Sequence, residues 1–594
     1  MIPIQHFIFG FQKFQVDSIF FESNHECQLK NSESISFELP PDKEGSISFD
    51  GIGNSLPLQF LQNHTMIENI KIISHLKTQH AVLSIIHVHD DGSQTTVFED
   101  EIDTHEGQWE SPWLPLTGPG GRYYLSVSFR GDFLIGETAW WSDAKTDLTP
   151  SFLVSTTTFK REKYVLDLIP EILAYKPLAR LNLSFLVVDN GRTLSMEQFP
   201  EDSRLTLFSQ TNLGGTGGFM RAFIHAQNIG AKYLAISDDD IVMHPETLYR
   251  MIIFQILSKS PTGFGALMLS MQQPTIAMEQ GGFLDLDSIA NFKTINTKTS
   301  LSDAAQTGKL YEEHPPAYSG WWLFSAPVES LSFIPPYFIY ADDILTGYLL
   351  KRKNVSTAVP PNCFVWHGEL SSKISFWKRY FRWRNHLITR MILEKRLGWH
   401  HVIRMKSFWK SLVEYLACYD YELANLFSKA VIDALTPPQK WISEEKDHAG
   451  TIQALMKIGP KESSLGDSLS KQNQDLIWKN KSKIQRGLRK IFYYVSVASY
   501  LNPFARTATS NGRLVSRFDG DYEAWKWVGF SRIAVIDHNN DGYVCQRSWS
   551  RLLGSLILAA KATVLYFMNY KKVAHSYSRF AIDASVWLKI FDQK

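Results

Sequence analysis

The stretch LAISDDDIVMHP, residues 234–245, places three adjacent aspartates between a short apolar run and a segment with helical character. Like charges this close repel one another and raise each other's pKa, so something must offset their cost. Alternate side chains of an extended segment point the same way, so Asp238 and Asp240 can share one ion while Asp239 points elsewhere. Hard oxygen ligands of this kind suit Mg²⁺ or Mn²⁺. The alternative is a solvated acidic turn that stabilises the next helix, and spacing alone favours neither.

The segments before this cluster alternate between strand and helix patterns from about residue 151. The strand patterns are SFLVSTTTF (151–159), LNLSFLVVDNG (181–191), RLTLFSQ (204–210) and AKYLAISDDD (231–240), and KREKYVLDLIPEILAY (160–175) is a helix pattern. Such alternation predicts a Rossmann-like α/β domain with a mostly parallel sheet. Ligands of these sheets bind at the carboxyl ends of the strands. Asp189, Asn190 and the aspartate cluster all follow strands at those ends.

The rest of the chain predicts two flanking domains. Residues 1–150 contain β-prone runs and a hairpin pattern around Asp-Asp-Gly, which predict a β-sandwich that is either a scaffold or a carbohydrate-binding module. Helical patterns dominate after about residue 395. We therefore expect the α/β domain to span 151–395 and a mainly helical C-terminal domain to span 396–594.

Two further motifs carry polar side chains that suit the same site. In IYADDILTGYLL, residues 339–350, Asp342 and Asp343 follow an apolar run and precede a helix. They either cap that helix or provide a general base for an attacking hydroxyl. In FVWHGEL, His367 is either a packed residue or a third ligand for an ion that already has two carboxylates. Mixed nitrogen and oxygen ligation tilts the choice of ion toward Mn²⁺.

Three other stretches have both structural and functional interpretations. NLGGTGGF, residues 212–219, lacks the spacing of known phosphate loops, and its glycines permit either close approach of a ligand or a tight turn before a helix. Residues 371–410 are basic and aromatic, with Glu394 as the only acid, which suits a packed amphipathic helix or binding of a diphosphate or anionic membrane. DHNNDGYVCQRS, residues 537–548, opens like a calcium loop but lacks the final Glu, so it predicts a hairpin turn.

The composition narrows the classes of function. The 594 residues carry a net charge of +1, and no nucleic-acid-binding motif is present, so we expect no nucleic acid partner. The four cysteines lie far apart and fit free thiols in a reducing cytosol. The N-terminus lacks a basic segment and cleavage site, which predicts no signal peptide. The apolar run 552–568 is interrupted by Lys561 and is short for a membrane span, so it predicts a packed or interfacial helix.

Taken in order, nine motifs of this chain resemble those of family 2 glycosyltransferases, and within them the bacterial galactofuranosyltransferases such as mycobacterial galactan polymerases. The motifs are TTTFKRE, VVDNG, NLGGTGGF, SDDDIVMHPE, EQGGF, SGWWLFSAP, FIYADDILTGYLLKRK, FVWHGE and RYFRWRNHL. The match is dense from about residue 152 to 390. The resemblance implies a GT-A fold, a UDP-galactofuranose donor, a divalent cation and a growing cell-surface glycan acceptor on a lipid carrier.

The resemblance also implies roles for individual residues. Asp238, Asp240 and His367 would hold a Mn²⁺ or Mg²⁺ ion. Asp343 would deprotonate the acceptor hydroxyl, which attacks the anomeric carbon with inversion as UDP leaves. The residues implied to bind the donor are Arg161, Asp189, Asn212, Gly214, Gly215, Tyr380 and Arg384. Those implied on the acceptor side are Trp321, Trp322 and Asp342.

Two departures from the mycobacterial pattern leave alternatives open. Ala341 stands where that pattern has Trp, and Leu345 where it has Glu. Both lie in the acceptor region, so they leave the acceptor and the linkage open more than the reaction. Because these positions shape the pocket, transfer of another nucleotide sugar is one alternative function, and a non-catalytic glycan-binding protein on a degenerate transferase fold is another. We expect a cytoplasmic protein. Peripheral contact with the inner face of the membrane and assembly into homo-oligomers are both compatible with the sequence.

Overall fold

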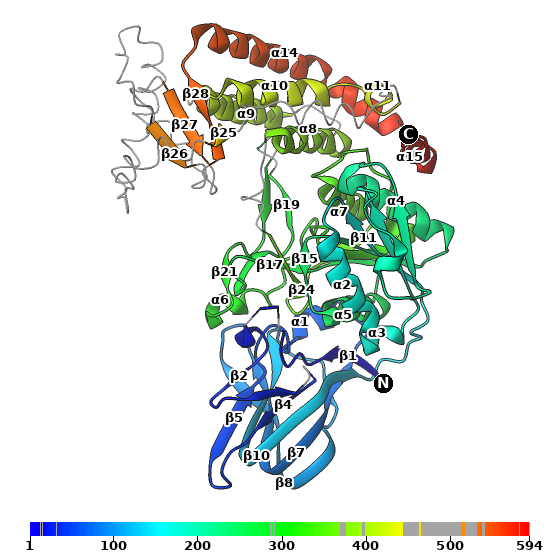
Figure 1. Cartoon of the computed structure of the whole chain (residues 1–594), viewed down its shortest axis with the longest axis vertical. Helices are drawn as coiled ribbons and strands as arrows, with labels where there is room; N and C mark the ends of the chain where they lie inside the picture. Colours follow the sequence, from blue (N-terminus) through cyan, green and yellow to red (C-terminus); the bar gives the residue numbers. More distant parts are fainter. Residues whose placement is uncertain are drawn as a thin grey trace.

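A computed structural model describes residues 1–443 except 12, 15, 31–32, 286–287, 289–290, 369–375, 395–397 and 418, and then residues 541–592 except 581. Between 443 and 541 it describes only three short strands. The polar stretch PKESSLGDSLSKQNQD (460–475), whose composition predicts a loop, lies outside the described residues apart from Ser463 and Ser464. Figure 1 shows three parts stacked along the long axis: a β-domain at the bottom, an α/β domain in the middle and a helical layer at the top.

The N-terminal part is built on two long antiparallel strands, β7 (Asn69–Val88) and β10 (Arg122–Ser142). β8 (Gln94–Glu110) pairs with the outer edge of β7. The other edge of β10 pairs in turn with β6 (Leu56–Pro57), β5 (Glu44–Ser48), β4 (Ser34–Phe37) and β1 (Ile2–His6). The β structure predicted for this part is present, but the sandwich is not confirmed, because all ten strands connect into one sheet. The remaining elements are β2 (Glu22–Ser23), β3 (Gln28–Lys30), α1 (Leu58–His64) and β9 (Leu114–Pro115).

The central sheet has seven strands in the order β13-β12-β11-β14-β22-β16-β23. Its first four strands are parallel, as the alternating pattern predicts, whereas β22 runs antiparallel to both of its neighbours. The sheet is therefore mixed. The strands are β11 (Phe152–Thr158), β12 (Leu183–Asp189), β13 (Leu205–Ser209), β14 (Tyr233–Asp238), β16 (Thr262–Gly265), β22 (Leu323–Pro327) and β23 (Ser356–Ala358). The helices of this domain are α2 (Glu162–Ala174), α3 (Lys176–Ala179), α4 (Gly214–Asn228), α5 (Pro245–Ile256), α6 (Ala304–Gly308) and α7 (Asp342–Arg352).

A second sheet of five strands, in the order β15-β24-β17-β18-β21, lies beside the first. Its strand β15 (Ile241–Val242) begins directly after the aspartate cluster, and β24 (Phe364–His367) ends in the histidine. The two strands pair antiparallel, with Ile241 opposite His367. This register brings His367 to the aspartates. The other strands are β17 (Leu267–Ser270), β18 (Ile276–Glu279) and β21 (Thr299–Ser300), and a separate hairpin joins β19 (Gly282–Leu284) to β20 (Phe292–Thr294).

Helices form the upper layer. α8 (Phe376–Leu393), which contains much of the basic aromatic stretch, packs against α10 (Tyr421–Ala434) and α14 (Trp549–Arg579). The hairpin predicted near residue 540 is confirmed, since β27 (Arg532–Ile536) pairs antiparallel with β28 (Asp541–Gln546). The Trp587 indole donates to the carbonyl of Ile334 and fixes the last helix on the α/β domain. The other elements are α9 (Trp399–Ala417), α11 (Pro438–Ser443), α15 (Ala584–Phe591), β25 (Ser463–Ser464) and β26 (Arg513–Ser516).

A buried charged network joins the N-terminal domain to helix α5. Both side chains of the Glu246–Arg250 pair are fully buried, with 3.0 Å between Arg250 Nε and Glu246 Oε1. Glu246 also contacts His6 of β1, and Arg250 donates to the His6 carbonyl at 2.6 Å. Burial opposes ionisation of Glu246, but His6 and Arg250 outweigh it and lower its pKa to about 2. Because both side chains are buried, water cannot take the place of either partner. The network therefore holds the two domains together.

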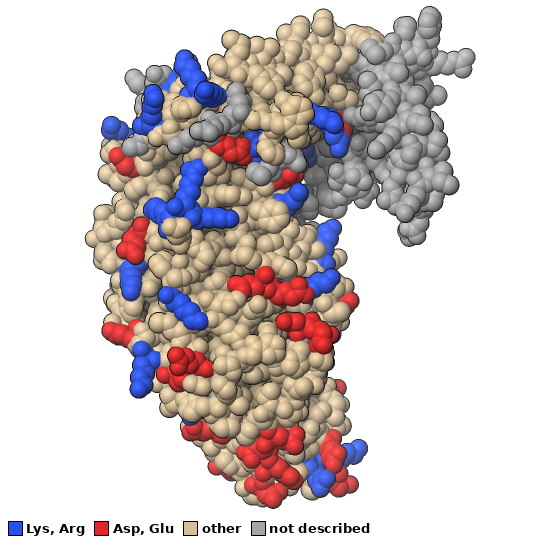
Figure 2. Space-filling view, turned by 180° about the vertical axis from the view of Figure 1, so that it is seen from behind, with Lys and Arg blue, Asp and Glu red and all other residues tan. Residues whose placement is uncertain are grey.

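Charged side chains are unevenly distributed over the molecule. Figure 2 shows acidic residues gathered at the lower end of the visible face, over the β-domain. Within this domain, strand β8 is itself acidic and carries Glu99, Asp100, Glu101, Asp103, Glu106 and Glu110. The upper end of the same face carries mainly Lys and Arg among uncharged side chains.

Candidate functional site

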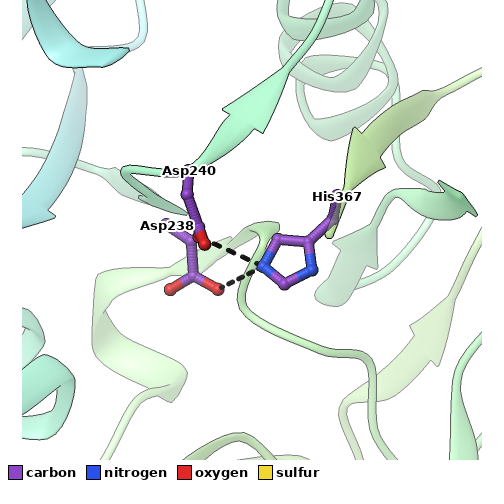
Figure 3. Close-up of side chains that lie close together, drawn as sticks. All are labelled: Asp238, Asp240 and His367. Carbon is purple, nitrogen blue, oxygen red and sulfur yellow. Dashed lines mark ion pairs between the residues drawn. The ribbon is translucent and has the colours of Figure 1, made fainter. Parts of the chain in front are cut away.

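Asp238, Asp240 and His367 lie together at the carboxyl end of β14 (Figure 3). His367 Nε2 lies 3.2 Å from Asp240 Oδ1 and 3.7 Å from Asp238 Oδ2. One ligand atom from each residue falls within 4.8 Å of the others. Two carboxylates and one imidazole nitrogen are a donor set that Mn²⁺ and Mg²⁺ accept, with the nitrogen favouring Mn²⁺. The residues therefore fit a divalent cation.

The protonation of Asp238 supports the same interpretation. Burial, together with the charges of Asp240 and Asp239, raises its pKa to about 7, although 39% of its side chain stays accessible to water. His367 acts in the opposite direction and lowers the pKa of this carboxyl. A bound divalent cation would favour the ionised carboxylate in the same way and more strongly. Carboxylates that are hard to ionise alone and converge on one point are typical of a cation site.

Asp239 holds Arg161 beside the cluster. Its Oδ2 accepts a hydrogen bond from Thr158 Oγ1 at 2.9 Å, and its Oδ1 accepts from Arg161 Nη1 at 2.8 Å. The same Arg161 nitrogen lies 3.0 Å from Asp240 Oδ2. The sequence left Asp239 without a role, and the structure gives it one, which is to position a guanidinium beside the cluster. Contact of Arg161 with a donor stays a prediction.

Asp342 and Asp343 open helix α7, after Ala341 with a left-handed φ of +69°. Asp342 Oδ2 accepts from Thr216 Oγ1 at 2.7 Å, which ties α7 to α4. Burial, and then the charge of Asp342, raise the pKa of Asp343 well above its ordinary value, and Glu279 and Asp238 add to this shift. A carboxylate with a raised pKa accepts a proton more readily. The arrangement suits a base beside a cation site.

Glu279 is a further carboxyl at this site, and sequence reasoning assigned it no role. It ends β18, is only 6% exposed and faces the Tyr318 hydroxyl. Burial raises its pKa to about 8. Its position in the quoted motif EQGGF, after a short apolar run, was the available signal. The pattern does not show that β18 lies beside Asp343.

The glycine-rich segment forms the start of helix α4. Asn212 Oδ1 accepts from the Gly214 amide at 3.0 Å. Gly214 has a φ of +69°, and a Cβ added there would lie 2.0 Å from the carbonyl oxygen of Phe338. Gly214 is thus required for packing α4 against the segment that leads to Asp343. Gly215 follows in the first turn of α4, and a donor contact by any of these residues stays a prediction.

Several predicted binding residues are already engaged by the protein. The Asp189 carboxylate accepts from the amides of Gly191, Thr193 and Leu194 and so shapes its own loop. Trp321 and Trp322 are 6% and 7% exposed, which leaves little ring surface for a sugar. Their roles as donor and acceptor contacts stay predictions.

Tyr380 faces helix α10 of the helical layer, and Arg384 faces the segment that precedes α7. The Tyr380 hydroxyl donates to Asp433 Oδ2 at 2.7 Å. Arg384 donates to the Tyr337 carbonyl at 3.3 Å, and its guanidinium lies 4.9 Å from the Phe381 ring centroid. These contacts engage the Tyr380 hydroxyl and part of the Arg384 guanidinium, the groups that the resemblance assigns to the donor. That assignment stays a prediction.

Comparison with known proteins finds two curated relatives. The galactofuranosyltransferase GlfT2 of Mycolicibacterium smegmatis is 24% identical over 439 residues, which cover 69% of this chain and 66% of the relative. GlfT2 of Mycobacterium tuberculosis is 25% identical over 362 residues, 57% of each chain. The chain thus spans between about half and two thirds of the length of these relatives. The matches confirm the resemblance to bacterial galactofuranosyltransferases.

Other comparisons are more distant. No protein-family model matches the chain. Among solved structures, a mannosyltransferase from Pyrobaculum calidifontis in complex with GDP-Man and Mn²⁺ is 15% identical with a TM-score of 0.28, and covers 53% of this chain and 87% of its own. S. aureus TarS residues 1–349 are 15% identical with a TM-score of 0.30, and cover 51% of this chain and 83% of their own.

Proposed function

We propose that this protein is a metal-dependent, inverting glycosyltransferase of the GT-A type. It moves galactofuranose from UDP-galactofuranose to a growing cell-surface glycan on a lipid carrier. The observation that carries the proposal is the convergence of Asp238, Asp240 and His367 on one point, with Asp238 close enough to the buried Asp343 to help raise the pKa of that carboxyl. The sequence similarity to two galactofuranosyltransferases supports the choice of donor.

The metal site would hold Mn²⁺ or Mg²⁺ through the two carboxylates and the imidazole. When bound, such an ion stabilises the negative charge that builds on a leaving diphosphate. Arg161, fixed by Asp239 beside Asp240, adds a second positive charge at the same edge. A preoriented positive charge of this kind needs no reorganisation during the reaction.

Asp343 would act as the general base. Its carboxylate takes the proton of the acceptor hydroxyl while the acceptor oxygen bonds to the anomeric carbon. The bond between that carbon and the diphosphate oxygen breaks on the opposite side, UDP leaves, and the configuration inverts. Asp342, held by Thr216, fixes the start of α7 and so the position of the base.

We expect this sugar transfer to take place in the cytoplasm, at the inner face of the membrane where lipid-linked acceptors are found. A second candidate is transfer of another nucleotide sugar, favoured by Ala341 and Leu345 where the mycobacterial pattern has larger or charged residues. A non-catalytic glycan-binding protein would have no use for the intact set of carboxylates and histidine.

A panel of nucleotide sugars tests the proposal. We expect UDP release from UDP-galactofuranose only when Mn²⁺ or Mg²⁺ is present, and no release from the other donors. Release from a different donor would support the second candidate, and glycan binding without release from any donor would overturn the transferase assignment. Mn²⁺ binding measured alone adds an independent test, because Asp240→Asn is expected to weaken it at least about tenfold while the neighbouring Asp239→Asn largely retains it.

A further inference from the structure

Arg221 of helix α4 packs against two aromatic rings that come from distant parts of the chain. Its guanidinium carbon lies 4.3 Å from the ring centroid of Phe208 in β13 and 3.6 Å from that of Phe591 in α15. Figure 1 shows α15 beside α4 at the C-terminal end of the chain. A guanidinium is attracted electrostatically to the face of an aromatic ring, and more strongly where water is excluded. Phe591 therefore helps to fix the position of Arg221.

A series of side-chain hydrogen bonds leads from Arg221 back to the start of the same helix. Arg221 Nε donates to Gln210 Oε1 at 3.0 Å, and Gln210 Nε2 donates to Asn190 Oδ1 at 2.9 Å. Asn190 Nδ2 then donates to the Gly214 carbonyl at 3.0 Å. Gln210 and Asn190 are only 5% and 4% exposed, so water does not readily take the place of these bonds.

The direction of these hydrogen bonds depends on Arg221. A guanidinium can only donate, so it requires the Gln210 oxygen to face it, and this turns the Gln210 amide nitrogen toward Asn190. The Asn190 oxygen accepts that bond, which leaves its amide nitrogen to face the Gly214 carbonyl. If Arg221 moved away, neither amide would have a fixed orientation.

The hydrogen-bonded side chains lie at the strand ends where the donor site is predicted. Asn190 follows Asp189 at the carboxyl end of β12, and Gln210 follows the carboxyl end of β13. Gly214 is also held from its other side, because Asn212 accepts from its amide at 3.0 Å. The resemblance assigns Asp189, Asn212 and Gly214 to the donor. A shift of these bonds would therefore move backbone that the donor is predicted to contact.

We propose that Phe591 and Arg221 are positioning residues for the nucleotide of the donor. The ring of Phe591 holds Arg221, Arg221 orients the amides of Gln210 and Asn190, and these amides fix the backbone at the start of α4. Phe591 acts through Arg221 and needs no contact with the donor. The inference rests on the proposed function, because it concerns the binding of a nucleotide sugar. It adds to that site the last helix of the chain, to which the sequence assigned no role.

Donor kinetics and UDP binding of the full chain test the proposal. Phe591→Ala is expected to raise the KM for UDP-galactofuranose, and the Kd for UDP with Mn²⁺, about three- to tenfold with little change in kcat. Phe591→Tyr keeps a ring against Arg221 and should retain most of the affinity. Arg221→Lys keeps the charge but loses the planar guanidinium, so it should weaken UDP binding about as much as Phe591→Ala.

A matched control and a second readout separate positioning from general stability. Leu588 lies on the same helix and is 42% exposed, so Leu588→Ala should leave the KM and Kd unchanged. Hydrogen exchange followed by mass spectrometry needs no donor. Phe591→Ala and Arg221→Lys should speed exchange across residues 190–194 and 210–216, and Leu588→Ala should not. Thermal melting checks that each variant folds.

Three results would overturn the proposal. The first is a folded Phe591→Ala variant with native UDP affinity, whether or not its exchange is faster. The second is a lower kcat with unchanged KM, and the third is an equal loss of affinity in Leu588→Ala. The proposed function fails separately, when the native chain turns over no nucleotide sugar. UDP affinity and hydrogen exchange of the variants then still decide whether Phe591 positions the nucleotide.

Discussion

The carboxyl of Asp343 has an environment suited to proton transfer, because burial and neighbouring acids raise its pKa well above the ordinary value. A base that takes part in the transition state contributes about 10²- to 10⁴-fold to a rate. Asp343→Asn is therefore expected to lower kcat by about that factor and to leave Mn²⁺-dependent UDP binding intact. Turnover and calorimetric UDP binding measure the two effects. Asp342→Asn is the control, and a larger loss there than at Asp343 would reverse the two roles.

Glu279 gives the site a pH dependence that can be measured through stability. Its pKa is about 8 in the folded chain because of burial, whereas an exposed Glu has a pKa of about 4.3. The folded state then holds the proton more tightly, so stability is greatest below the unfolded pKa and falls as pH rises toward 8. Glu279→Gln removes this loss. We expect the variant to unfold at higher urea concentration than the native chain at pH 8, and the difference to vanish near pH 4.5. A difference independent of pH would contradict the assignment.

Helix α4 depends on the backbone of its first residue. Gly214→Ala forces a side chain onto a φ of +69° and brings Cβ to 2.0 Å from the Phe338 carbonyl oxygen. We expect a loss of more than about 2 kcal/mol in unfolding free energy and a parallel loss of activity, since Phe338 belongs to the segment before Asp343. Gly230→Ala is the matched control, because Gly230 has a φ of +66° with nothing within 4 Å of the added Cβ. Its cost is expected near 1 kcal/mol. Equal losses at both positions would mean that contact with Phe338 does not matter.

Local sequence patterns correctly predicted the strands and turns whose formation depends on neighbouring residues. The apolar runs correctly predicted the parallel strands β11, β12, β13 and β14. The acidic side chains that end β12 and β14 lie at the carboxyl ends of these strands, as predicted. The antiparallel β22 was not predicted, because a short apolar run carries no direction. Pairings between distant segments were also inaccessible, such as Tyr380 with Asp433. His367 was predicted to be a ligand only from its chemical type and the resemblance, and the pairing of β24 with β15 supplies the physical reason for its position beside the aspartates.

The N-terminal domain and the helical layer both pack against the α/β domain that carries the site. The N-terminal domain meets the α/β domain through the buried Glu246 network and through Phe11, whose ring stacks on Trp366 at 5.2 Å, one residue before His367. At the other end, Trp587 fixes the last helix on the α/β domain.

The coupling of the first two domains is testable at Glu246. Removing one partner of a buried ion pair leaves an uncompensated charge and costs about 3–5 kcal/mol, so Glu246→Gln should lower the urea midpoint strongly at pH 7. The Glu246 pKa of about 2 is depressed, so the stabilisation is full above the unfolded pKa and is lost as pH falls toward 2. The native chain and the variant should therefore converge in acid. Glu171→Gln is the control, since its pair with Lys13 joins the same two domains but is partly exposed, and its loss should stay within about 1 kcal/mol. Equal effects of the two changes at pH 7 would show that the buried network does not hold the domains together.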